Sequence, residues 1–199
     1  MSHDTWIHHV ARAAVRPMIG TRIQPNHLTT FRLLTGLAAA SAFAVGAAPW
    51  PDVGGVLFVF SMVLDRADGE LARLSAKTSA GGHTYDLVAD SVCNMSAFIG
   101  LGVGLRESAP GFWAIPLGVL AGAAVAGILW LTLRLEERRG ARAAELKSIC
   151  GFDVDDAVLI VPVAVWLGWS VPLLVVAAIG APAFLVFFSW HCGRRLARP

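Results

Sequence analysis

The sequence predicts an all-α integral membrane protein in which an interfacial amphipathic helix precedes six transmembrane helices. The first observation behind this prediction is composition. Of the 199 residues, 56% are hydrophobic and only 15% are charged, whereas a soluble domain carries about 25% charged residues. The second is that apolar runs of helical length recur along the chain, separated by short turns. An ordinary soluble domain is excluded, and the net charge of +2 does not indicate a nucleic-acid ligand.

Residues 1–24 are the expected interfacial segment, and residues 25–199 are the expected six-helix domain. In the segment, apolar residues alternate with His and Arg at roughly helical spacing: Trp6, Ile7, Val10, Ala14, Val15 and Ile19. This spacing favours an amphipathic helix in the membrane interface. A frayed cytoplasmic tail is the alternative.

The first two spans follow this segment. Asn26 is the expected N-cap of a span that covers about residues 28–48, and a second span begins near Val53. Only twelve apolar residues separate the turn from Asp65, too few to cross about 30 Å of hydrocarbon. Either the helix continues through Asp65 and Asp68, or these acids lie inside the membrane boundary. Both alternatives place them in the protein interior.

A polar connection is expected at residues 74–84, before the remaining spans. These spans are expected at about residues 85–105, 112–133, 157–169 and 171–190. A charged cytoplasmic loop is expected from Arg134 onwards.

Glycines in GxxxG spacing occur in two spans, at Gly100 with Gly104 and at Gly118 with Gly122. This spacing predicts close helix contact, either within the bundle or at a dimer seam.

The distribution of basic residues predicts the orientation. Of sixteen Lys and Arg residues, only Arg106 lies on the side of the turns at residues 49–52 and 106–110. Because positive charge is retained on the cytoplasmic side, both termini and the long loops are expected in the cytoplasm. The expected location is therefore the cell (inner) membrane, as a multi-pass protein.

Four aspartates at helical intervals are the chemical centre of the sequence: Asp65, Asp68, Asp86 and Asp90. The members of each pair are three or four residues apart and share one helix face. Carboxylates at the edge of a membrane stay ionised only with countercharge, and two divalent cations supply the right amount. Such ions can clamp a pyrophosphate, and Asp90 is a plausible general base for an attacking hydroxyl.

Two glycines and an arginine accompany these acids. Gly69 and Gly82 remove side-chain bulk where a ligand or another helix comes close. Arg73 lies one helical turn after Gly69, where it can contact a phosphate or neutralise the carboxylates.

The whole pattern resembles the signature of the CDP-alcohol phosphatidyltransferase family. All eight fixed residues of that signature are present in Asp65-x2-Asp68-Gly69-x2-Ala72-Arg73-x8-Gly82-x3-Asp86-x3-Asp90. The length and the six-span layout resemble the family over the whole chain.

This resemblance implies roles for individual residues. Asp65, Asp68 and Asp86 would hold two divalent ions, Mg²⁺ or Mn²⁺, while Asp90 would touch one metal and act as the base. The nucleotide would be bound by Gly69, Ala72, Arg73 and Gly82, together with Asn26 and Thr29 at the start of the first span. For Asn26, a simple helix cap is an equally good explanation.

The resemblance also implies an activity. A CDP-linked lipid, preferably CDP-diacylglycerol, would donate its phosphatidyl group to a small polar alcohol with release of CMP, in a homodimer surrounded by membrane lipids. Arg134 and Arg194 are candidates for the acceptor pocket, although basic residues at span ends also serve orientation. Two alternatives stay open: a CDP-choline or CDP-ethanolamine phosphotransferase acting on diacylglycerol, and a divalent-cation transporter.

Overall fold

The computed structural model describes residues 15, 17, 24–75, 79–139 and 158–196, and in these residues every regular element is helical. The elements are α2 (Pro25–Val45), α3 (Trp50–Leu74), α4 (Ala80–Gly104), the short 3₁₀ helices η2 (Leu105–Glu107) and η3 (Gly111–Trp113), α5 (Ala114–Arg139), α6 (Ile160–Trp166) and α7 (Ser170–Leu196). The all-helical prediction is confirmed for this part of the chain.

Four helical stretches are long and apolar enough to cross a membrane: Pro25–Val45, Ala80–Glu107, Gly111–Glu137 and Ser170–Trp190. The structure therefore supports a membrane protein but does not confirm six spans. The expected interfacial helix lies outside the described residues, apart from Val15 and Pro17. Val15 is buried in a small cluster with Leu28, Ala67 and Leu71.

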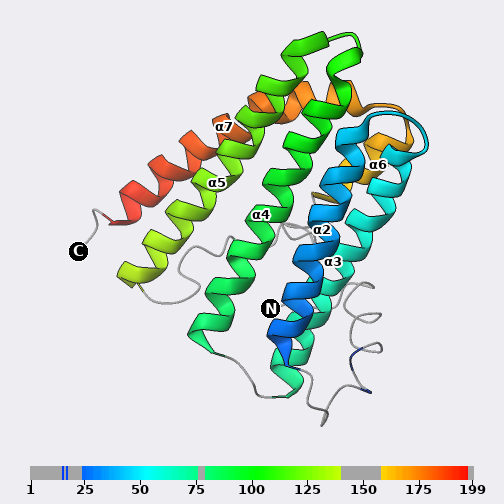
Figure 1. Cartoon of the computed structure of the whole chain (residues 1–199). Coiled ribbons are helices and arrows are strands. Elements are labelled where there is room, and N and C mark those ends of the chain that lie inside the picture. The colour runs from blue at the N-terminus through cyan, green and yellow to red at the C-terminus, as the bar shows by residue number, and fades with distance from the viewer. Residues whose placement is uncertain (1–14, 16, 18–23, 76–78, 140–157, 197–199) are drawn as a thin grey trace.

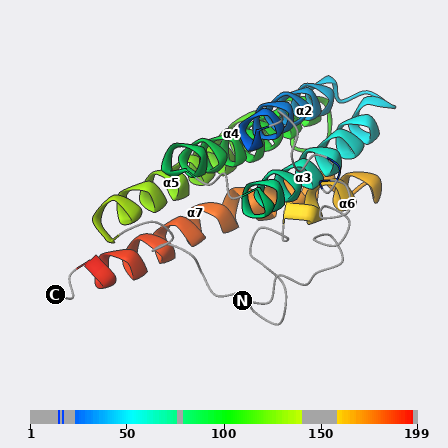
Figure 2. The same cartoon turned by 90° about the horizontal axis from the view of Figure 1, so that it is seen from below.

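The helices form a bundle in which α2 packs against α3 and α4, and α4 packs against α5 (Figure 1). Helix α7 lies along α5, and the short α6 packs on α3 (Figure 2). The start of α2, the end of α3 and the start of α4 meet at one end of the bundle, here called the motif end because it carries the aspartates. The turns that follow α2 and α4 lie at the opposite end, here called the turn end.

Helix α2 begins two residues earlier than an N-cap at Asn26 would place it, and Asn26 is not its N-cap. The N-cap is Gln24, whose backbone N–H donates to Nδ1 of His27 at 3.3 Å. Pro25 follows at the first helical position, where its missing N–H removes no helical hydrogen bond. Asn26 therefore lies within the first turn of the helix.

Helices α3 and α4 run through the aspartate motif. Helix α3 continues without a break from Trp50 to Leu74, so the first of the two alternatives for Asp65 is confirmed. Helix α4 begins at Ala80, within the stretch expected to be a connection, because Ser79 caps it by accepting the N–H of Gly82 at 3.0 Å.

The two remaining differences concern α5 and α6. Helix α5 continues to Arg139 through the stretch expected to be a loop, and its Leu135 is buried against Phe188 of α7. This apolar contact explains why the helix does not end at the last span residue. Helix α6 has only seven residues, about 10 Å of helix, so within the described residues the fifth span is not confirmed.

Both glycine pairs are used within the bundle. A Cβ atom added to Gly100 or Gly104 would meet the backbone of α2, and one added to Gly118 or Gly122 would meet the backbone of α4. The intramolecular alternative is therefore confirmed for these residues, since the helices approach as closely as small residues permit.

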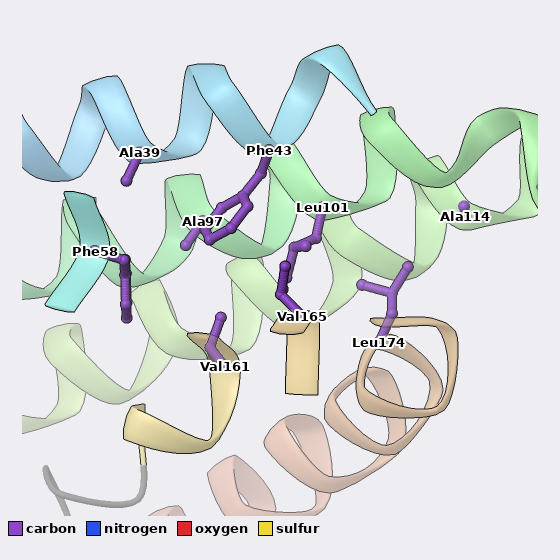
Figure 3. Packing of buried hydrophobic residues seen from close by; sticks show 9 residues of the cluster. All are labelled: Ala39, Phe43, Phe58, Ala97, Leu101, Ala114, Val161, Val165 and Leu174. Atoms are coloured by element: carbon purple, nitrogen blue, oxygen red, sulfur yellow. The ribbon is translucent and has the colours of Figure 1, made fainter. Parts of the chain in front are cut away.

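An apolar core joins α2 to α7, the α-helices among the described residues, towards the turn end (Figure 3). Its buried members are Ala39, Phe43, Phe58, Ala97, Leu101, Ala114, Val161, Val165 and Leu174. This core fixes α2, α3 and α4 relative to one another, and these are the helices that carry the polar residues of the motif end.

Candidate functional site

A buried arginine that the sequence analysis did not assign lies at the centre of the aspartates. The side chain of Arg32 is 3% exposed, and its Nη1 lies 2.7 Å from Oδ1 of Asp65 and 3.0 Å from Oδ1 of Asp86. Its Nη2 lies 2.5 Å from Oδ1 of Asp90. The planar guanidinium presents its donors as a fork, which allows one side chain to contact three carboxylates. Arg32 therefore supplies part of the countercharge that had been expected from bound ions and from Arg73.

The backbone of the same residue joins the three helices. The carbonyl oxygen of Arg32 accepts a hydrogen bond from Oγ of Ser61 on α3 at 3.1 Å, and Sγ of Cys93 on α4 lies 4.0 Å away. These contacts fix the backbone of α2 at Arg32 against both of its neighbouring helices.

The sequence does carry a signal for Arg32. It lies inside the predicted first span, and a charged residue inside a span is by default a candidate for function. It also follows Thr29 by three residues, so both side chains share one face of α2.

Three of the four aspartates converge. Asp65, Asp68 and Asp86 each offer a carboxylate oxygen, and these oxygens lie within 4.8 Å of one another. Asp68 is 3% exposed and accepts a hydrogen bond from Oγ1 of Thr29 at 2.9 Å. Carboxylate oxygens are the donors that hard divalent cations such as Mg²⁺ and Mn²⁺ prefer, so this donor set fits such an ion.

The fourth aspartate lies outside this group of converging oxygens. Oδ1 of Asp90 is contacted by Arg32 and also accepts a hydrogen bond from Nδ2 of Asn94 at 3.1 Å. Asn94 was not identified from the sequence, although it continues the four-residue interval of Asp86 and Asp90. Asp90 and Asn94 line a small pocket together with Asp65 and Arg66.

The residues expected to bind a nucleotide lie at the motif end in two different environments. A Cβ atom at Gly82 would lie 3.3 Å from Oδ1 of Asn26, so α2 and α4 approach closely there. A Cβ atom at Gly69 would meet nothing within 4 Å, so a ligand has room to approach this part of α3. Thr30 and Tyr85, whose hydroxyl oxygens are 2.9 Å apart, hold the same ends of α2 and α4 together.

Arg73 is paired with an acid outside the motif. Its Nη2 donates to Oε1 of the buried Glu70 at 2.9 Å. Arg73 was expected either to neutralise the aspartates or to contact a phosphate. In this structure its charge is paired with Glu70, and contact with a phosphate stays a prediction. Ala72, its neighbour, is partly buried on the same helix.

The two acceptor candidates differ in what the structure describes. The guanidinium carbon of Arg134 lies 4.1 Å from the ring centroid of Trp130, one turn earlier on α5, and its side chain is exposed. Arg194 lies in α7, but its side chain is outside the described residues. Nε2 of His83, next to Gly82 on α4, lies 3.2 Å from Oε2 of Glu136 on α5.

Two known proteins are similar to this chain in sequence. The chain is 27% identical over 172 residues to the "Bifunctional IPC transferase and DIPP synthase" of Aquifex aeolicus (strain VF5), which covers 83% of this chain and 38% of the relative. It is 38% identical over 74 residues to the protein of the same name from Archaeoglobus fulgidus, covering 36% of this chain and 14% of that relative. The chain therefore spans well under half the length of these relatives.

The sequence model of the CDP-alcohol phosphatidyltransferase family matches residues 22–177, which include all the helices that carry the aspartates and their partners. The chain belongs to the CDP-alcohol phosphatidyltransferase family.

Proposed function

We propose that this protein is a membrane phosphatidyltransferase that moves a phosphatidyl group from CDP-diacylglycerol to the hydroxyl of a small polar alcohol and releases CMP in phospholipid biosynthesis. The observation that carries the proposal is the convergence of Asp65, Asp68 and Asp86 within 4.8 Å, with Asp90 beside them, in a chain of this family. A cluster of acids at the polar end of a bundle, with Asp68 buried and the other three partly exposed, has no packing advantage, because each charge must be compensated. Such a cluster favours a catalytic use.

In the proposed reaction, Asp90 takes the proton of the acceptor hydroxyl, and the hydroxyl oxygen attacks the β-phosphorus of the donor. The bond between this phosphorus and the oxygen that bridges to the α-phosphate breaks, and CMP leaves with that oxygen. Two divalent cations, Mg²⁺ or alternatively Mn²⁺, held by Asp65, Asp68 and Asp86 and touched by Asp90, would supply electrostatic stabilisation of the pyrophosphate charge.

We place the nucleotide at the open side of Gly69, next to Thr29 and Asp68, with Asn26 and Gly82 on the opposite wall. Ala72 and Arg73 extend this surface by one turn of α3. Support comes from the open space beside Gly69 and from the close approach of α2 and α4 at Gly82. The acceptor would be met by Arg134 and Arg194 on the cytoplasmic side.

The location and assembly follow from the sequence pattern and the family. Because the basic residues are concentrated on one side of the predicted spans, we propose that both termini and the active site face the cytoplasm from the cell (inner) membrane. Assembly as a homodimer is proposed from the family resemblance.

A purified-enzyme assay tests the proposal. The protein in detergent, with CDP-diacylglycerol and Mg²⁺, is screened against serine, glycerol 3-phosphate, inositol phosphate and choline, and CMP is measured together with the lipid product. We expect CMP release with one acceptor and none after EDTA treatment, restored by added Mg²⁺ or Mn²⁺.

Parallel reactions address the alternatives. If CMP is released only from CDP-choline or CDP-ethanolamine in the presence of diacylglycerol, the lipid is the acceptor and not the donor. Metal flux into vesicles without any CMP release would replace the enzyme by a transporter, which family membership argues against.

A further inference from the structure

We propose that Asn94, which lies outside the family signature, is a positioning residue that orients the carboxylate of Asp90 for proton transfer. The inference rests on the proposed function, in which Asp90 is the base.

The geometry at Asp90 supports this role. Its Oδ1 receives two donors from different directions: Nη2 of Arg32 on α2, and Nδ2 of Asn94 one turn further along α4. The final side-chain torsion of an aspartate is intrinsically broad, with no sharp rotamer wells. Two donors on the same oxygen restrict this torsion, because rotation of the carboxylate would break both contacts.

The pocket beside Asp90 indicates why the orientation of its carboxylate matters. Asp90 and Asn94 border the same pocket, and Arg32 and Asp65 border it as well. An acceptor hydroxyl that is to lose its proton to Asp90 must enter next to this carboxylate. Asn94 thus fixes the plane of the carboxylate at the place where the hydroxyl would approach.

The chemical type of the side chain also fits. An amide donates a hydrogen bond without adding charge, whereas a carboxylate at residue 94 would add a further negative charge to an already acidic cluster. The converging oxygens belong to Asp65, Asp68 and Asp86. Removal of the amide donor should therefore lower the rate of proton transfer much more than the affinity for the ions.

The decisive variants are Asn94→Leu, which has a similar shape without a donor, and Asn94→Gln, which keeps a donor on a longer stem. Thr84→Ala is the matched control, because it removes an exposed side-chain hydrogen bond from the same helix (Thr84 Oγ1 to the carbonyl of Ala80, 3.2 Å). Three quantities are measured: kcat, KM for CDP-diacylglycerol, and the Kd for Mn²⁺ in the absence of substrate by electron paramagnetic resonance.

We expect Asn94→Leu to lower kcat about tenfold to hundredfold, the range for one hydrogen bond to a charged group. The KM for donor and the Kd for Mn²⁺ should stay within about twofold of the parent values, because the converging oxygens belong to Asp65, Asp68 and Asp86 and the contact of Asp90 with a cation is the smaller part of that site. Asn94→Gln should recover part of the lost kcat, and Thr84→Ala should match the parent.

A parental kcat in Asn94→Leu overturns the inference, and so does a loss of Mn²⁺ affinity that parallels the loss of kcat, because that would indicate a structural role. If Asn94→Leu does not elute as a folded protein, Asn94→Ala takes its place, since it removes the donor without adding an apolar branch. Parent activity separates the two proposals. If the parent and the Asn94 variants release CMP equally well, only the proposed role of Asn94 is wrong. If the parent is inactive, the proposed function is wrong, and so is the inference that rests on it.

Discussion

The two ends of the bundle are held together in opposite ways. At the turn end, aromatic and aliphatic side chains from six helices pack around small residues, and glycines let the backbones of α2 and α4 approach closely. At the motif end, ion pairs and hydrogen bonds centred on Arg32 join α2, α3 and α4, next to a small apolar cluster that includes Leu28 and Leu71. Lipid is as apolar as leucine, so helix association in a membrane depends on close packing and on polar contacts of this kind.

The two ends should differ in how well they tolerate substitutions. An apolar side chain removed at the turn end leaves a cavity that its neighbours can partly fill. A partner removed at the motif end leaves a charge that packing cannot replace. Single substitutions at the turn end should therefore lower the stability moderately and leave activity unchanged. At the motif end, a few residues determine both stability and activity.

The largest effect is expected for Asp90→Asn. The amide has the size of the carboxylate but cannot accept the hydroxyl proton, so turnover should fall by about 10²–10⁴-fold, the usual contribution of a positioned base. CMP release from CDP-diacylglycerol measures this loss, while size-exclusion elution and donor binding should stay near the parent values. Near-normal turnover in this variant would remove Asp90 from the mechanism.

The second variant, Arg32→Met, tests whether the motif end depends on its buried cation. Loss of one partner from a fully buried ion pair destabilises by about 3–5 kcal/mol, and the effect here should be smaller because the carboxylate partners of Arg32 are 22%, 38% and 43% exposed. We expect a lower unfolding midpoint in detergent without metal, and a larger recovery on addition of Mg²⁺ than the parent shows.

Two further variants serve as references for Arg32. Arg32→Lys should be intermediate, since a compact ammonium cannot reach three carboxylates as a guanidinium does. Ser41→Ala, which removes an exposed hydrogen bond from the same helix, should leave the midpoint unchanged. An unchanged midpoint in Arg32→Met would mean that the aspartates do not need this cation.

The sequence predicted the two ends unequally. The helical class and the convergence of three aspartates could be predicted, because helical spacing and apolar composition are local properties. The continuous passage of α3 through Asp65 was one of two alternatives that the sequence left open. Arg32 and Asn94 were missed because their roles depend on which helix faces which, and the spacing of one helix does not contain this information. Both lie at helical intervals from residues that were identified, Thr29 and Asp90.

The helix boundaries were less predictable for a similar reason. Helix α4 begins earlier than predicted because Ser79 caps it. Helix α5 ends later than predicted because Leu135 packs against Phe188 of α7. The first of these is a local signal within the sequence, whereas the second is a tertiary contact that overrides the charged composition of the segment.

Phe58→Ala probes the turn end and should have a smaller effect, confined to stability. Phe58 is 2% exposed and packs against Phe43, with ring centroids 6.3 Å apart. Its truncation should lower the free energy of unfolding by about 3 kcal/mol through the cavity that remains. The kcat per folded molecule should stay at the parent value.

Phe60→Ala on the same helix is the control, because Phe60 is 45% exposed and its removal opens no internal cavity. If Phe58→Ala lowered kcat as strongly as Asp90→Asn at equal amounts of folded protein, the division between a stabilising end and a chemical end would be wrong.

The smallest effect on stability is expected for Arg134→Ala. Arg134 stacks on Trp130 at an exposed site, where a cation–π contact contributes about 0.5–1 kcal/mol. Trp130→Leu should lower the unfolding midpoint by a similar amount, and the double variant should add little, because both single changes remove the same contact. The kinetic result decides whether Arg134 also belongs to the chemical end. As a ligand of the acceptor it should raise KM for an anionic acceptor more than for a neutral one, and leave kcat unchanged. If KM stays the same for both kinds of acceptor, Arg134 stabilises the end of α5 and takes no part in acceptor binding.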